Sequence, residues 1–140
     1  MIRYYPGVDL VNRNRLQSVF LRRSGLLEEV FSERERKECL SRKDPWKHLA
    51  GRFAVKEACL KALRLGFSTA GIDHALGEIE VLAKNSRRSE LLMHAWVAKV
   101  GRKRKISRGE LSITYAGDYA LATVVLVAES PCGSNISGSR

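Results

Sequence analysis

Strand-like and helix-like patterns alternate along the first half of the chain. Residues 2–11 are rich in β-branched and aromatic side chains and are interrupted by Pro6-Gly7. Such side chains favour strands, whereas proline or glycine inside a strand marks an edge, a bulge or a close backbone approach. We therefore expect an N-terminal strand that is broken or bulged at Pro6-Gly7, with Asp9 directly after the break.

Helical periodicity follows this strand. In residues 14–27 the apolar positions recur at helical spacing. The exposed side of this helix is basic and carries Arg15, Arg22 and Arg23, and Gly25 marks its expected end. Ser32 stands three residues before Glu35 in the capping-box pattern, which predicts a second, short helix up to residue 40.

A long helix is the most informative segment. Asp44-Pro45 opens it, and it is expected to run over residues 46–65. At about 100° per residue, one face forms an apolar core stripe, made of Leu49, Phe53, Leu60 and Leu63. Glu57 and Lys61 lie off this stripe, one turn apart. Their neighbours on the helix surface are small, namely Ala50, Ala54 and Ala58. This low bulk indicates room for a ligand beside Glu57 and Lys61.

The middle of the chain has a mixed pattern. Residues 78–83 alternate between apolar and polar positions and predict a strand. Residues 90–100 are ambiguous in period, but the spacing of their apolar positions favours a helix. The basic run 101–105 is expected to be a loop.

A β-hairpin is predicted at the end of the fold. Residues 111–115 alternate, residues 116–118 supply a turn, and residues 119–128 form a nearly continuous apolar run, typical of a buried strand. The following segment is rich in serine, glycine, proline and asparagine. We therefore expect a single domain over residues 1–128 and a disordered tail over residues 129–140.

Composition and charge narrow the class of protein. The chain has 140 residues, of which 44% are hydrophobic and 29% are charged, as in a globular domain. It has no apolar run long enough for a membrane helix and no signal-peptide pattern, so a cytoplasmic location is expected. Its three widely spaced cysteines predict free thiols. The net charge of +10 favours anionic partners such as phosphates, nucleic acid or an acidic protein, although a basic surface also serves solubility.

Glu57, Lys61 and Asp9 are the residues most suited to chemistry. Glu57 and Lys61 alone would be an ordinary surface ion pair on a helix. Asp9 adds a second carboxylate, and it follows Gly7, where the backbone can approach another group closely. Two carboxylates with water and phosphate oxygens suit magnesium, and a lysine adds a charge for the phosphates. The separation of Asp9 from Glu57 in sequence leaves open whether they meet.

Several motifs together resemble one family. They are GVDLV at residues 7–11, LAGRFAVKEA at 49–58 with Lys61-Ala62, LSIT at 111–114 and DYA at 118–120. The second motif is the most specific. In this combination the chain resembles the holo-acyl-carrier-protein synthases, the small 4′-phosphopantetheinyl transferases.

The resemblance implies a fold and an activity. The fold would be α+β, with an antiparallel sheet packed on a long helix, in a homotrimer with sites between subunits. The activity would be magnesium-dependent transfer of 4′-phosphopantetheine from coenzyme A to a serine of apo-acyl carrier protein, with release of 3′,5′-ADP. The resemblance leaves open which acidic carrier protein is the partner.

The resemblance also assigns roles to residues. The magnesium ligands would be Asp9 and Glu57, and the catalytic residues Glu57 and Lys61. Coenzyme A would be bound by Arg52, Lys56, Lys61, Ser112 and Thr114. The acidic carrier protein would dock on Arg15, Arg22 and Arg23.

Two positions depart from the family pattern and keep alternatives open. Members usually carry histidines on either side of the serine-containing strand, where this chain has Glu110 and Tyr115. A degenerate paralogue that binds coenzyme A or the carrier without turnover is one alternative. A nucleic-acid-binding module is another, supported by the basic run 102–105. That run has no interleaved aromatics, which favours a solvated basic loop and argues against nucleic acid. The three histidines, His48, His74 and His94, are unclustered and receive no chemical role.

Overall fold

The computed structural model describes residues 1–66, 69 and 74–130, so the predicted tail lies outside the described residues from residue 131 onward. The strands are β1 (Ile2–Asn12), β2 (Ile79–Ala83), β3 (Ser89–Met93), β4 (Ile106–Ala116) and β5 (Tyr119–Glu129). The helices are α1 (Arg13–Arg22), α2 (Leu26–Val30), α3 (Glu33–Leu40), α4 (Pro45–Ala62), the 3-10 helix η2 (Leu76–Glu78) and α5 (Ala95–Lys103).

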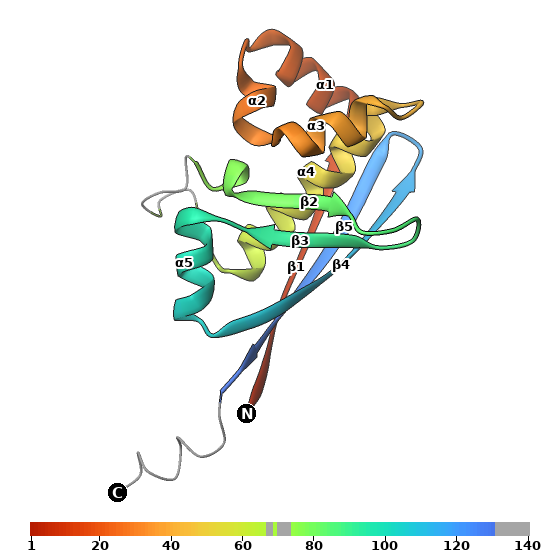
Figure 1. Cartoon of the computed structure of the whole chain (residues 1–140). Helices are drawn as coiled ribbons and strands as arrows, with labels where there is room; N and C mark the ends of the chain where they lie inside the picture. The colour runs from red at the N-terminus through yellow and green to blue at the C-terminus, as the bar shows by residue number, and fades with distance from the viewer. Residues whose placement is uncertain (67–68, 70–73, 131–140) are drawn as a thin grey trace, which may run out of the picture.

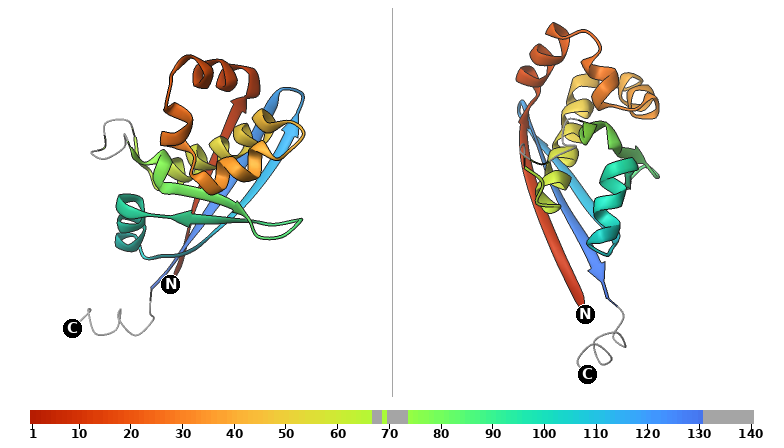
Figure 2. Two further views of the ribbon diagram at one scale, coloured as in Figure 1. Left: turned by 45° about the horizontal axis from the view of Figure 1, so that its top comes forward. Right: turned by 90° about the vertical axis from the view of Figure 1, so that its left-hand side faces the viewer.

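Helix α4 is the centre of the molecule. An antiparallel sheet in the order β1-β5-β4 covers one side of it, and the β2-β3 hairpin lies across the other (Figure 1). The two further views show α4 between these layers, with α1, α2 and α3 gathered at one end (Figure 2). A helix covered on both sides needs apolar or small residues nearly all round. This arrangement confirms the predicted α+β fold with an antiparallel sheet on a long helix.

Strand β1 is continuous, so the predicted break at Pro6-Gly7 is wrong. Its register with β5 runs without a shift from Ile2 opposite Glu129 to Asn12 opposite Tyr119. Proline is tolerated because β1 is the edge strand of its sheet. A side chain at Gly7 would collide with the carbonyl oxygen of Ala58 in α4. Glycine therefore marks a close approach of strand and helix rather than a bulge.

The alanines of α4 serve the same close approach. Ala50, Ala54 and Ala58 are fully buried in the core. The alanines themselves therefore do not leave the room expected for a ligand, because β1 and β5 pack against α4. The small residues bring the sheet close to α4, and this sets the distance between Asp9 and Glu57.

The N-terminal helices follow the sequence pattern with one division. The single helix expected over residues 14–27 is split into α1 and α2 at Gly25, whose φ of 84° is left-handed. The capping box of α3 is confirmed, because Ser32 and Glu35 each accept a hydrogen bond from the other's backbone N–H, at 3.1 and 3.0 Å. Phe20 anchors α1 by packing on the rings of Phe31, Trp46 and Phe53.

The expected helix over residues 90–100 is only half right. Its first part is strand β3, in which Leu91 and Leu92 pair with Val81 and Glu80 of β2. Helix α5 begins at Ala95 and extends through most of the predicted basic loop. Pairing with β2 decides the structure of a segment whose own period is ambiguous. In the described part of the chain, no helix is both long and apolar enough to cross a membrane.

The C-terminal hairpin is confirmed, and Arg13 fixes its turn. Strands β4 and β5 are joined by Gly117-Asp118, with a φ of 57° at Gly117. The guanidinium of Arg13 donates to Asp118 at 2.9 Å and to Asp44, the N-cap of α4, at 2.8 Å. Arg13 therefore ties the hairpin turn to the start of α4, beside α1, and sequence reasoning missed this role.

Candidate functional site

Asp9 and Lys61 meet where β1 crosses the end of α4. The ammonium of Lys61 lies 2.8 Å from Oδ1 of Asp9 and donates to the carbonyl oxygen of Val8 at 3.2 Å. The side chain of Asp9 is 16% exposed and that of Lys61 is 55% exposed. The structure thus brings together residues whose meeting the sequence left open.

Glu57 lies one turn before Lys61 on the same helix and is half-buried. Burial raises the pKa of its carboxyl group above the usual range, and the negative charge of Asp9 raises it further, while Lys61 opposes the shift. The direction follows because both burial and a neighbouring carboxylate disfavour the ionised form. Two carboxylates therefore share a site with one ammonium, and a further cation would relieve their repulsion.

The donor set suits magnesium. Magnesium binds oxygen ligands and keeps several waters, so one or two carboxylates are its usual protein contribution. Asp9 and Glu57 supply that number from two different elements. Among the described residues, no group of three or more His, Cys, Asp or Glu side chains gathers as a metal site. The residues therefore fit a magnesium ion shared with water and substrate, not an ion enclosed by protein.

An open cleft of about 400 Å³ extends from the carboxylates towards α1. One wall of the cleft is charged and is formed by Asp9, Glu57 and Arg15. The other wall is apolar and includes Leu16, Val19, Phe20 and Phe53. Arg22 is the last residue of α1 and Arg23 is its C-cap, and neither is part of the lining. Arg22 hydrogen-bonds Ser18, and Arg23 lies 3.5 Å from Glu29. Of the three predicted docking arginines, the structure places Arg15 beside the carboxylates.

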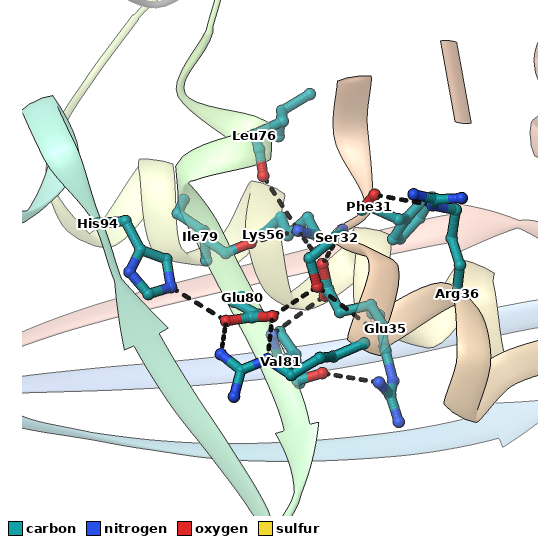
Figure 3. Close-up of polar contacts among 12 residues, drawn as sticks. Phe31, Ser32, Glu35, Arg36, Lys56, Leu76, Ile79, Glu80, Val81 and His94 are labelled. Atoms are coloured by element: carbon teal, nitrogen blue, oxygen red, sulfur yellow. Dashed lines mark hydrogen bonds and ion pairs between the residues drawn. The ribbon is translucent and has the colours of Figure 1, made fainter. Parts of the chain in front are cut away.

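The side chain of Lys56 makes its polar contacts in the interior of the protein. It is fully buried, and its ammonium donates to Oε1 of Glu35 at 2.8 Å, to the carbonyl oxygen of Leu76 at 3.0 Å and to that of Ile79 (Figure 3). Burial lowers the pKa of Lys56, whereas the carboxylate of Glu35 opposes that shift. Each of its three donors has an acceptor, so we withdraw the expectation that Lys56 contacts coenzyme A.

Arg52 has the same kind of role. Its side chain is 10% exposed, donates to the carbonyl oxygen of Val81 at 2.7 Å and lies 2.7 Å from Oε1 of Glu38. These contacts join α4 to α3 and β2. The specific motif of α4 thus contains two cations that hold the fold together, and Arg52 is likewise withdrawn as a coenzyme A ligand.

A second buried carboxylate, Glu80, completes this polar cluster. It accepts hydrogen bonds from Ser32 at 2.5 Å, from Arg34 at 2.6 and 3.1 Å, and from the His94 ring at 3.0 Å. Burial acts to raise its pKa, but hydrogen bonds from Ser32, Arg34 and His94 prevail and lower it to about 2. The cluster joins α3, β2 and the start of α5, and it is structural.

Ser112 and Thr114 lie on the other face of the sheet. Ser112 pairs with Thr123, which in turn pairs with Val8, so it shares the outward face with Val8 and not the inward face of Asp9. A hollow of about 230 Å³ beside it is lined by Arg87, Arg88 and Glu110. Within one chain, the predicted coenzyme A ligands are therefore divided between two faces.

The two positions that depart from the family pattern also face opposite ways. Glu110 is exposed on the outward face, near Arg87 and Arg88. Tyr115 points inward, with the Lys47 ammonium 4.8 Å from its ring centroid and its hydroxyl against Gly51. Neither side chain lies in the cleft of Asp9 and Glu57.

Known proteins resemble this chain over most of its length. The model of the 4′-phosphopantetheinyl transferase superfamily matches residues 5–124. The holo-[acyl-carrier-protein] synthase of Syntrophotalea carbinolica is 40% identical over 121 residues, covering 85% of this chain and 91% of that protein. That of Chlamydia pneumoniae is 38% identical over 124 residues, covering 87% and 95%. The ACPS–CoA complex of Chronobacterium ammoniagenes has a TM-score of 0.78 at 32% identity, covering 91% of this chain and 99% of that one.

Proposed function

The chain belongs to the 4′-phosphopantetheinyl transferase superfamily, and on that premise we propose that it is a holo-acyl-carrier-protein synthase. It transfers 4′-phosphopantetheine from coenzyme A to a serine of apo-acyl carrier protein. The observation that carries the proposal is the meeting of Asp9, Glu57 and Lys61 at the cleft. The family match spans the basic run 102–105, so a separate nucleic-acid module is not needed to explain that run.

The reaction is a phosphoryl-type transfer that depends on positioning and charge neutralisation. The carrier serine oxygen forms a bond to the β-phosphorus of coenzyme A, and the bond from that phosphorus to the bridging oxygen breaks, so 3′,5′-ADP leaves. Magnesium bound at Asp9 and Glu57 would supply positive charge to the diphosphate. Lys61 adds its ammonium beside Asp9. We assign Glu57, whose pKa is raised, as the acceptor for the serine proton.

The decisive experiment incubates the protein with coenzyme A, magnesium and apo-acyl carrier protein. A gain of one phosphopantetheine group in the mass of the carrier supports the proposal. Binding of coenzyme A without any mass gain would favour the degenerate paralogue instead.

Carrier docking gives a prediction for Arg15. Reversing its charge in Arg15→Glu raises the KM for an acidic carrier by up to about 10-fold, because complementary charges steer association. The KM for coenzyme A changes much less. Lys37→Glu is the matched control, since Lys37 is exposed on α3 and changes the net charge equally. Equal effects of Arg15→Glu on both substrates would remove the docking role.

We also propose a homotrimer with sites between its subunits. Tyr4, Val8 and Leu10 are each more than half exposed on the outward face of β1. Monomers rarely expose large contiguous apolar patches. Ser112 and Thr114 share that face, so packing between copies would carry them to a neighbouring subunit's carboxylates. We further propose that the enzyme works in the cytoplasm.

Sedimentation tests this assembly. The wild-type mass is expected to equal three chains, and Leu121→Glu, on the same outward face, is expected to reduce it to one. Transfer activity should fall with the mass, since each site would lose residues from its neighbour. Leu40→Glu is the control, because Leu40 is an exposed leucine on α3. A single-chain mass for the wild type would contradict the trimer.

A further inference from the structure

A basic hollow lies at the end of the sheet opposite to the end that meets α1. It is lined by Arg3 and Tyr5 of β1, Lys103 of α5, Arg104 and Lys105 of the α5–β4 corner, and Ala128 of β5. Its volume is about 460 Å³. At this end β1 and β5 extend beyond α4, and α5 lies beside them (Figures 1 and 2).

Among the described residues, no carboxylate forms an ion pair with the cations of this hollow. In the described part of the chain, no ion pair involves Arg3, Lys103, Arg104 or Lys105. Glu129 follows Ala128 in β5, and strand alternation directs it to the opposite face of the sheet. Within the residues that the structure describes, the positive charge of this concave site is therefore not compensated by an ion pair.

Arg104 carries a donor that the described protein does not satisfy. Its Nη1 atom is shielded from solvent and has no hydrogen-bond partner among the described residues. Buried polar groups almost always have partners, so this nitrogen is available to an acceptor that the described residues do not supply.

The geometry of the corner is also unusual. Lys105 has a φ of 59°, which is uncommon for a residue other than glycine. Two backbone hydrogen bonds hold it, from its N–H to Arg102 and from Glu129 to its carbonyl oxygen. Basic residues in the last turn of a helix complement its dipole, which accounts for Lys103. The dipole does not account for Arg3, which comes from another element.

We propose that the basic hollow binds a small molecule that bears a diphosphate group. The hollow carries four cations, so a ligand with more than one phosphate group matches its charge. The volume of the hollow is that of a small-molecule pocket. Tyr5 and Ala128 add an apolar wall beside the cations. Arg3 is six positions from Asp9 on β1, or about 20 Å at the usual strand rise. This site is therefore separate from the carboxylates of the cleft.

Calorimetric titration with inorganic pyrophosphate, without divalent cations, tests the proposal on the full chain. The double variant R104Q/K105Q is expected to bind pyrophosphate at least about 10-fold more weakly, since it loses two charge-assisted contacts. The double variant K37Q/K84Q removes the same charge from exposed sites elsewhere and should bind within about twofold of wild type. Arg3→Gln, on a different element, should weaken binding as well.

Further measurements distinguish the basic hollow from the cleft and identify its ligand. Lys61→Gln should retain this binding, and R104Q/K105Q should retain phosphopantetheine transfer, which separates the hollow from the proposed function. If ADP binds more tightly than pyrophosphate and loses affinity equally in R104Q/K105Q, the diphosphate comes from a nucleotide. If ADP and pyrophosphate bind with equal affinity, the ligand is the free diphosphate. The proposal is overturned if R104Q/K105Q and K37Q/K84Q weaken pyrophosphate binding equally. It is also overturned if the protein binds single-stranded RNA or anionic vesicles but does not bind pyrophosphate.

Discussion

Glu57→Gln abolishes phosphopantetheine transfer and at the same time stabilises the metal-free protein. The loss of transfer is expected to exceed about 100-fold, because the variant loses a proposed magnesium ligand and proton acceptor. The gain in stability has a separate cause, the burial of Glu57 beside the carboxylate of Asp9. A functional carboxylate held at the expense of stability is common in active sites.

The sign of the stability effect follows from proton linkage. The pKa of Glu57 is higher in the folded protein than in the unfolded chain. Between the two pKa values the folded state holds more of this proton, so the contribution of Glu57 to stability falls as the pH rises through that window. Above the folded pKa, the ionised group destabilises the fold, and glutamine removes that cost at neutral pH.

Thermal unfolding in EDTA and in magnesium separates the two effects. The Tm of Glu57→Gln should exceed that of wild type in EDTA, and magnesium should raise the Tm of wild type far more than that of the variant. Asp9→Asn should also reduce the magnesium effect. Glu28→Gln, at an exposed position of α2, is the control. Normal turnover by Glu57→Gln would refute the metal-ligand role.

The positions of Asp9, Glu57 and Lys61 were predictable only in part. Helix geometry places Glu57 and Lys61 on one face of α4. Nothing local in the sequence says that β1 crosses that face, so the meeting with Asp9 depended on a family resemblance. Gly7 carried a usable signal, because it was interpreted both as a bulge and as a close backbone approach, and the structure shows a close approach to Ala58. The sequence of one strand does not distinguish these two uses of glycine.

The role of Lys56 was also present in the sequence pattern. Lys56 follows Leu49 by seven residues and precedes Leu60 by four, so it lies on the apolar stripe and not on the face of Glu57. A lysine on such a stripe is either exposed at its edge or buried with a partner. The partner, Glu35, could not be identified, because its capping-box role already explained it. In the proposed homotrimer the contacts of Ser112 and Thr114 would come from another copy, so the sequence of one chain could not predict them.

Lys56→Met should lower the free energy of unfolding by about 3–5 kcal/mol, because it leaves the fully buried carboxylate of Glu35 without its cation. It also strips the carbonyl oxygens of Leu76 and Ile79 of a donor. For a small domain stabilised by about 5–15 kcal/mol, this is a large part of the total. Lys37→Met, at an exposed position of α3, should stay within about 0.5 kcal/mol of wild type.

The double variant K56M/E35L tests whether the pair acts as a unit. Its loss should be smaller than the sum of the two single losses, because no lone charge remains buried. It should still be less stable than wild type, since Glu35 also accepts from the backbone N–H groups of Ser32 and Val81. Urea unfolding at one fixed chain concentration measures all four proteins. If Lys56→Met were as stable as wild type but had a raised KM for coenzyme A, Lys56 would belong to the substrate site and not to the interior.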